Sequence, residues 1–302
     1  MAKECLQHPF NDSISEKIIT IRIGSFDIEG TLLSSNTRSI NQKLAIIIVG
    51  SGQTDRDGNS PLPGGTSNNL KMLAENLAGP DLAVFRYDKR GVGKSRPADF
   101  NRKYLRFEDY INEAERIFDY MHDSLGFKDI WYIGHSEGSD IAINAAQQRP
   151  VRGVISLSGS AVGADESILR QIKDQLPSLS GQATTIVDSL RHGIIVNDVP
   201  KKLSQLFAVD AQPYWISWMK HVPAEEIKTL NVPILIIHGT CDKQVAMEDA
   251  MKLKTIKPES KLVIIENMTH DLKDAKANCR DDENPSRPLN ALLVKEIKKF
   301  LN

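Results

Sequence analysis

The stretch Ile130-Trp131-Tyr132-Ile133-Gly134-His135-Ser136-Glu137-Gly138 decides the fold. It begins with an apolar run, typical of a short strand buried on both faces. It continues as G-x-S-x-G, a pattern that sets a serine at a sharp turn between a strand and a helix. The residues two before and two after this serine face neighbouring backbone, so glycine is needed at both. We therefore predict that Ser136 is a nucleophile, held at the amino end of a helix where developing negative charge is stabilised.

Strands and helices alternate around this motif. Apolar runs predict strands at residues 44–49, 82–87, 130–133, 151–157, 234–237 and 261–265. Helical periods lie between or after them, at residues 69–77, 107–125, 140–148 and 289–300. This alternation predicts an α/β fold with a mostly parallel central sheet and helices on both faces. Residues 17–24 and 26–33 alternate as strands do, and we expect them to form a hairpin at an antiparallel edge.

One segment of about 70 residues interrupts the alternation. It has no clear strand pattern, but helical periods occur at residues 168–176, 183–194, 201–207 and 211–219. Loops of this length inside a compact domain are usually functional. We expect residues 161–228 to be an inserted helical cap, and residues 1–160 and 229–302 to form one catalytic domain.

The composition is that of an ordinary globular protein, with 302 residues, 40% hydrophobic and 25% charged. Lys and Arg number 38 against 39 Asp and Glu, which argues against nucleic acid as a main partner. Three cysteines are too few for a disulfide-built fold, and their odd number leaves at least one free or paired outside the chain. No run is apolar enough to span a membrane, and residues 1–9 lack the pattern of a signal peptide. Taking the chain to start at Met1, we expect a cytoplasmic protein.

A nucleophilic serine requires a base, and the base requires a carboxylate that orients it. With a G-x-S-x-G turn of this kind, the chain order is serine, acid, histidine. Asp242 follows the strand at 234–237, and His270 lies in the loop after the strand at 261–265. The other histidines fail the order or the strand-end position: they are His8, His122, His135, His192, His221 and His238. We therefore predict Asp242 as the acid and His270 as the base.

The reaction also requires an oxyanion hole made of backbone N–H groups. One donor should be the residue after the nucleophile, which is Glu137. The other should lie in Gly50-Ser51-Gly52-Gln53, where glycine lets the backbone approach a substrate. We favour the N–H of Gln53, with Gly52 as the alternative.

With these residues in place, the chain resembles the α/β-hydrolase superfamily over roughly residues 40–302. The segment Asp88-Lys89-Arg90-Gly91-Val92-Gly93-Lys94-Ser95 is similar to the D-x-R-G-x-G-x-S segment of these enzymes, where its role is to brace loops near the site. Residues 50–59 and 212–218 resemble a bacterial serine carboxylesterase branch that has a helical cap. The resemblance implies hydrolysis of small to medium carboxylic esters through an acyl-enzyme. The chain lacks the H-G-G-G motif of lipase-like members, which disfavours bulky tertiary-alcohol esters.

Aromatic residues gather in the predicted cap. At helical spacing such residues usually pack in a core, but a cap over a serine site must also present apolar surface to the substrate. We predict a substrate-binding set that combines them with two residues near the nucleophile: Gly52, His135, Phe207, Tyr214, Trp215 and Trp218.

We predict no cofactor and no metal. Asp55-Arg56-Asp57-Gly58-Asn59 does not meet the spacing of a calcium loop, and we interpret it as a solvated turn beside the oxyanion loop. The same triad would serve a thioesterase, lactonase, peptidase or acyltransferase, and a non-catalytic ligand-binding protein of this fold is the alternative from another class. The expected partner is a small-molecule ester, and a homo-oligomer is left open.

Overall fold

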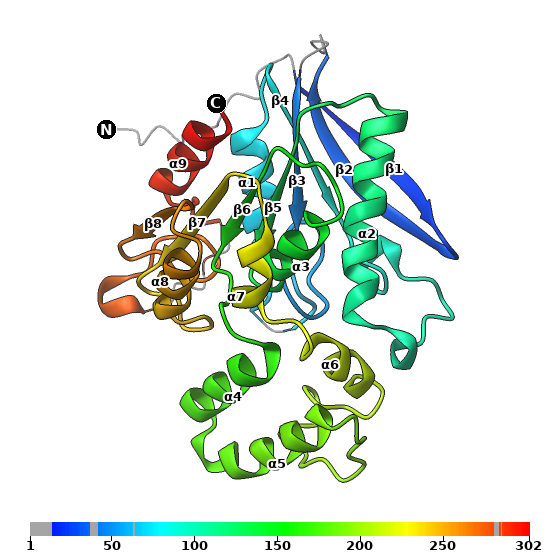
Figure 1. Cartoon of the computed structure of the whole chain (residues 1–302), viewed down its shortest axis with the longest axis vertical. Helices are drawn as coiled ribbons and strands as arrows, with labels where there is room; N and C mark the ends of the chain where they lie inside the picture. The colour runs from blue at the N-terminus through cyan, green and yellow to red at the C-terminus, as the bar shows by residue number, and fades with distance from the viewer. Residues whose placement is uncertain (1–13, 37–41, 63, 281–283, 285) are drawn as a thin grey trace, which may run out of the picture.

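The computed structural model describes residues 14–36, 42–62, 64–280, 284 and 286–302. Within them, eight strands form one sheet in the order β1-β2-β4-β3-β5-β6-β7-β8 (Figure 1). The strands are β1 (Ile14–Ile23), β2 (Phe26–Ser35), β3 (Lys43–Ile48), β4 (Leu82–Tyr87), β5 (Ile130–His135), β6 (Gly153–Leu157), β7 (Ile234–Gly239) and β8 (Lys261–Ile265). All neighbours from β4 to β8 are parallel, while β1 and β2 add an antiparallel hairpin at one edge. The predicted fold class is therefore confirmed.

Helices cover both faces of this sheet. They are α1 (Asn69–Leu77), α2 (Phe107–Asp119), α3 (Glu137–Ala145), α8 (Met247–Ile256) and α9 (Ala291–Leu301). Because side chains alternate along a strand, β3 and the residue after it contribute to the hydrophobic cores on both faces of the sheet. Leu44, Ile46 and Ile48 belong to the hydrophobic cluster that includes residues of α2, α3 and α8, whereas Ala45, Ile47 and Val49 belong to the cluster that includes residues of α1 and α9. This double burial explains why the strand reads as a continuous apolar run.

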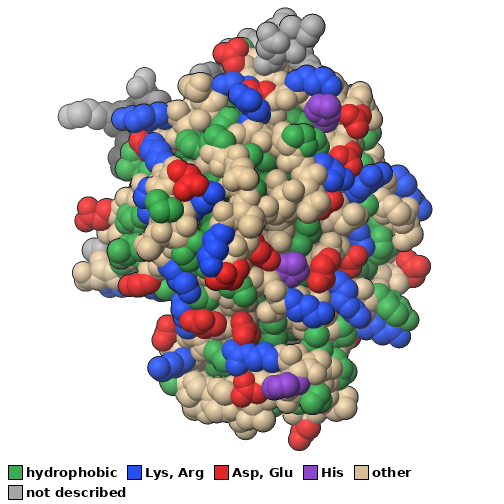
Figure 2. All heavy atoms as spheres, in the orientation of Figure 1, with side chains coloured by type: hydrophobic (Ala, Val, Ile, Leu, Met, Phe, Trp, Pro, Cys, Tyr) green, Lys and Arg blue, Asp and Glu red, His purple; other side chains and the backbone are tan. Residues whose placement is uncertain are grey.

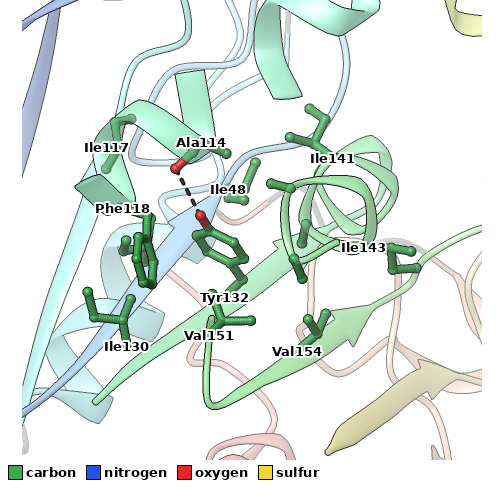
Figure 3. Packing of buried hydrophobic residues seen from close by; sticks show 14 of the residues in the cluster. Ile48, Ala114, Ile117, Phe118, Ile130, Tyr132, Ile141, Ile143, Val151 and Val154 are labelled. Atoms are coloured by element: carbon green, nitrogen blue, oxygen red, sulfur yellow. Dashed lines mark hydrogen bonds between the residues drawn. The ribbon is translucent and has the colours of Figure 1, made fainter. Parts of the chain in front are cut away.

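The strand that leads to Ser136, β5, is held in place from the α2 side. Tyr132 in β5 is fully buried, and its hydroxyl donates a 2.9 Å hydrogen bond to the carbonyl oxygen of Ala114 in α2 (Figure 3). In the same view its ring lies between Phe118 of α2 and Ile141 of α3. A buried hydroxyl requires such a partner, so the bond fixes α2 relative to β5.

Residues 161–228, which we call the α4–α7 segment, contain only helices, turns and loops, and all of them are described. The helices are α4 (Ala164–Gln175), α5 (Ser180–Arg191), α6 (Gln212–Trp218) and α7 (Pro223–Glu226). Residues 201–207, predicted as helical, form turns instead. Figure 1 shows α4, α5 and α6 grouped below the sheet. They enclose a hydrophobic cluster of their own, and Trp218 packs against both this cluster and the core on the α2 side.

The surface carries charges of both signs. Figure 2 shows Lys and Arg interspersed with Asp and Glu over the sheet domain and over the helices below it. This mixing on the visible face agrees with the net charge of -1. No helix in the described part of the chain is long and apolar enough to cross a membrane.

Candidate active site

Ser136 lies at the turn between β5 and α3 and has a strained backbone, with φ 55° and ψ −124°. Such values are rare for a residue with a side chain and persist only where the surroundings enforce them. The flanking glycines explain how the turn forms. A Cβ at Gly134 would lie 2.2 Å from the carbonyl oxygen of Gly138, and a Cβ at Gly138 would lie 2.1 Å from that of Ile48. Both positions therefore require glycine, as the motif predicts.

Asp242 and His270, which are 28 residues apart in the sequence, meet after the ends of β7 and β8. Their Oδ2 and Nδ1 atoms are 2.8 Å apart, and the carboxylate is fully buried. The other carboxylate oxygen of Asp242 accepts hydrogen bonds from the backbone N–H groups of Gln244 and Val245, at 2.9 and 3.0 Å. Burial alone would raise the pKa of Asp242, but the charge and hydrogen bond of His270, helped by the Val245 N–H, hold this pKa well below its ordinary value. The carboxylate is thus an anion aimed at the imidazole.

His135 connects the Ser136 turn to the His270 loop. Its Nε2 atom donates to the carbonyl oxygen of His270 at 2.7 Å, and the two rings are 4.9 Å apart. Among the described contacts, the Ser136 hydroxyl and the His270 ring share no direct hydrogen bond; such bonds often tighten only when substrate binds. The structure therefore brings Ser136, Asp242 and His270 to one edge of the sheet.

The environment of His135 predicts a pH dependence of stability. Burial, and then the neighbouring His270, lower its pKa to about 4. Between pH 6.5 and pH 4 the unfolded chain binds a proton that the folded chain does not, so stability falls as the pH falls. We expect His135 to contribute about 3 kcal/mol to this loss.

Urea unfolding at pH 7 and pH 4.5 measures this contribution. His135→Gln should lose clearly less stability than the wild type between the two pH values, because glutamine does not titrate. His192→Gln, at an exposed histidine, is the matched control and should behave like the wild type. Equal losses in His135→Gln and the wild type would contradict the prediction.

The loop after β3 lies directly against Ser136. A Cβ at Gly50 would be 3.1 Å from the Cβ of Ser136, and Ser51, Gly52 and Gln53 line the same cavity as Ser136. Gly52 has φ +75°, a conformation that favours glycine. As the first residue of α3, Glu137 has an N–H without an intrahelical partner. These groups are those predicted for the oxyanion hole.

The turn at residues 55–59 differs from its prediction as a solvated turn. Arg56 is 8% exposed, and its guanidinium pairs with Asp88 at 2.9 Å and with Glu29 at 2.5 Å. Its backbone N–H also donates to Asp88, at 2.7 Å. These ion pairs therefore hold the turn against β2 and against the residue that follows β4, and the turn anchors the loop that follows β3.

A cavity of about 290 Å³ adjoins Ser136, in the range of small-ligand sites. Its walls include Tyr214, Trp215 and Trp218 from α6, together with Gly52, all predicted to bind substrate. Two of the described residues predicted to bind substrate, Phe207 and His135, do not line this cavity. Phe207 is fully buried and packs on Trp215 in the cluster of the α4–α7 segment, and His135 points toward the His270 loop. For these two residues the prediction requires correction.

The structure also brings residues to the site that the sequence reasoning missed. Lys89 and Tyr110 lie beside Glu137, and Asp140 lines the cavity and accepts a 2.9 Å hydrogen bond from the Trp218 indole. The sequence held a signal for Lys89, because this lysine and Glu137 each come two residues after a buried strand and have opposite charges. Asp140 had no comparable signal, since acidic residues in the first turn of a helix are common.

Cys241 and Cys279 form a disulfide with Cα atoms 5.1 Å apart. It joins the loop that carries Asp242 to the segment after His270. The third cysteine, Cys5, lies outside the described residues.

Loss of this disulfide should destabilise the protein. With a sequence separation of 38, restricting the unfolded chain is worth about 4 kcal/mol in the loop-entropy model. The double variant Cys241→Ala/Cys279→Ala should therefore unfold at a lower urea concentration than the oxidised wild type. The wild type treated with dithiothreitol is the control and should unfold near the variant. Coincident midpoints for the oxidised wild type and the variant would contradict the prediction.

Comparisons with known proteins agree with this geometry. Residues 64–209 match the family model described as "Serine aminopeptidase, S33". The chain is similar to esterase EstD of Thermotoga maritima, at 26% identity over 232 residues that cover 74% of this chain. It spans about half of that relative, 53%. Among solved structures it is similar to Est1E from Butyrivibrio proteoclasticus with ferulic acid bound, with a TM-score of 0.63, 19% identity, and 94% and 97% of the two chains covered. It is also similar to the Pyrococcus furiosus esterase Pf2001, with a TM-score of 0.58, 15% identity and coverages of 95% and 92%.

A serine on a strained strand-to-helix turn, within a mostly parallel eight-stranded sheet of this order, is typical of the α/β-hydrolase fold. The chain has the α/β-hydrolase fold, which it shares with these esterase structures.

Proposed function

We propose that this protein is a serine carboxylesterase that hydrolyses small to medium carboxylic esters through an acyl-enzyme on Ser136. The observation that carries the proposal is the 2.8 Å contact between His270 and Asp242 at the edge of the sheet where Ser136 is exposed to the cavity. The similarity to EstD, a protein named as an esterase, supports the same reaction.

In the proposed mechanism, Ser136 Oγ attacks the ester carbonyl carbon while Nε2 of His270 accepts its proton. Asp242 holds the proton of the imidazole on Nδ1 and stabilises the imidazolium that forms. The N–H groups of Glu137 and Gln53 bind the oxyanion. His270 then protonates the departing alcohol, and water activated by His270 hydrolyses the acyl-enzyme.

We propose that the α4–α7 segment is a cap that forms the substrate wall. Tyr214, Trp215 and Trp218 supply an apolar and aromatic surface opposite the nucleophile. A cavity of about 290 Å³ suits an ester of modest size.

A peptidase is the second candidate, because the matching family model is described as a serine aminopeptidase. Recognition of a free peptide amino group requires an available carboxylate near the nucleophile. The carboxylate of Glu137 is paired with Lys89. Burial, and then the charge of Glu226, raise the pKa of Asp140 well above its ordinary value, which disfavours a negative charge there. Both acidic groups of the cavity are thus unsuited to this task, which favours an ester.

Labelling with a fluorophosphonate tests the proposal and separates an enzyme from a binding protein of the same fold. We expect stoichiometric labelling of the wild type at Ser136, and none in Ser136→Ala. Lack of labelling in the wild type would contradict a serine hydrolase of any kind.

The predicted cytoplasmic location is in tension with the disulfide, because disulfides are rare in reducing compartments. Alkylation of intact cells, followed by mapping of the modified cysteines, distinguishes a reducing compartment from an oxidising one. A cytoplasmic protein would have Cys241 and Cys279 alkylated, whereas protection of both would indicate an oxidising compartment.

A further inference from the structure

We infer that Lys89 is a positioning residue that links the two backbone segments of the oxyanion hole; this inference rests on the proposed function. Tyr214 connects the α4–α7 segment to the same group of residues, which consists of Lys89, Gly50 and Glu137.

Lys89 contacts both segments at once. Its side chain is fully buried, and its Nζ atom donates to the carbonyl oxygen of Gly50 at 2.8 Å and to Oε2 of Glu137 at 2.8 Å. Gly50 begins the loop that leads to Gln53, and Glu137 carries the other candidate N–H donor. A single ammonium group therefore sets the spacing between the two donors.

The strand order explains this convergence. β4 and β5 lie on either side of β3, so the residues that follow all three strands meet at one edge of the sheet. Lys89 comes two residues after β4, Gly50 two residues after β3, and Glu137 two residues after β5. The ammonium group thus reaches across the end of β3 to the nucleophile turn.

The environment of Lys89 supports a fixed position. Its Nζ atom lies 4.3 Å from the centre of the Tyr110 ring, a cation–π contact. Glu137, 5% exposed, supplies the opposite charge. A buried charge without a partner is strongly unfavourable, so each of these groups holds the other in place.

Tyr214 links the group formed by Lys89, Gly50 and Glu137 to the α4–α7 segment. Its hydroxyl donates to Oε1 of Glu137, the carboxylate oxygen that Lys89 does not use. Its ring also lines the cavity and lies 5.6 Å from that of Tyr110. A substrate that displaces Tyr214 thereby acts on the residue whose N–H binds the oxyanion.

The alternative is an ordinary buried ion pair that supports only the fold. The two roles differ in their kinetic effects. A group that only stabilises the fold changes the amount of active protein, whereas a group that positions oxyanion donors lowers kcat per folded molecule.

The test compares Lys89→Met, which keeps the chain length but removes the charge, with Lys89→Met/Glu137→Gln, which removes both charges and leaves neither buried alone. We expect kcat for p-nitrophenyl acetate to fall on the order of 100-fold in both variants, with KM changed less than about threefold. Tyr214→Phe should lower kcat by a smaller factor, about 5-fold. The control is Lys257→Met, at a buried lysine remote from the site, which should keep the wild-type kcat.

Active-site concentrations are measured by phosphonate titration, so loss of folded protein does not enter kcat. A wild-type kcat in the double variant would overturn the role of Lys89 and leave the proposed esterase intact. An inactive and unlabelled wild type would instead overturn the proposed function, and with it this inference.

Discussion

Replacement of Ser136 by alanine is expected to lower kcat/KM for p-nitrophenyl acetate by roughly 10⁵-fold. The reason is that the acyl-enzyme is expected to form on Oγ of Ser136, which alanine lacks, while the backbone N–H groups and the cavity remain. The loss should be as large for every ester that the wild type hydrolyses, because the step removed is common to all of them.

The same position provides a check on folding. Ser136→Gly should be equally inactive but should unfold at a higher temperature than Ser136→Ala, since glycine relieves the strain of a φ of 55°. Retention of near wild-type activity by either variant would contradict the assignment of the nucleophile.

The second large effect is expected for Asp242→Asn, with a loss in kcat of about 10⁴-fold. Asparagine keeps the shape of the side chain, but its amide can donate to Nδ1 of His270 where the carboxylate accepts. The imidazole then carries its proton on Nε2, and it cannot accept the proton of Ser136.

The matched control is Asp271→Asn, which changes a carboxylate directly beside His270 that pairs with Thr269 and Ser67 instead. We expect its kcat to stay within about threefold of the wild type. Equal losses in the two variants would mean that negative charge near His270 matters in general, and that Asp242 has no special role.

The fold was largely predictable because its strands are buried on both faces and its helices have one apolar face. Ile46 and Ile47 show this well: they lie on opposite faces of β3, and both are buried. The turn at Ser136 was predictable for a different reason. Gly134 and Gly138 leave no room for a side chain, so the motif reflects steric exclusion.

Pairing of buried charges was less predictable. Arg56 looked like part of a solvated turn, because its partners are distant in the sequence: Glu29 lies in β2, and Asp88 directly follows β4. Phe207 was misplaced because an aromatic residue in a small helical segment can face either the cavity or the segment's own core. In each case the outcome depends on which distant elements pack together, and local sequence patterns do not contain that information.

The central claim is that Ser136 is acylated by ester substrates. Rapid acid quenching of the protein with p-nitrophenyl acetate, followed by intact-mass and peptide mass spectrometry, tests it most directly. We predict an adduct of one acetyl group on the peptide that contains Ser136, absent from Ser136→Ala. Turnover of the ester with no acetylated protein, or with the acetyl group on another residue, would contradict the mechanism.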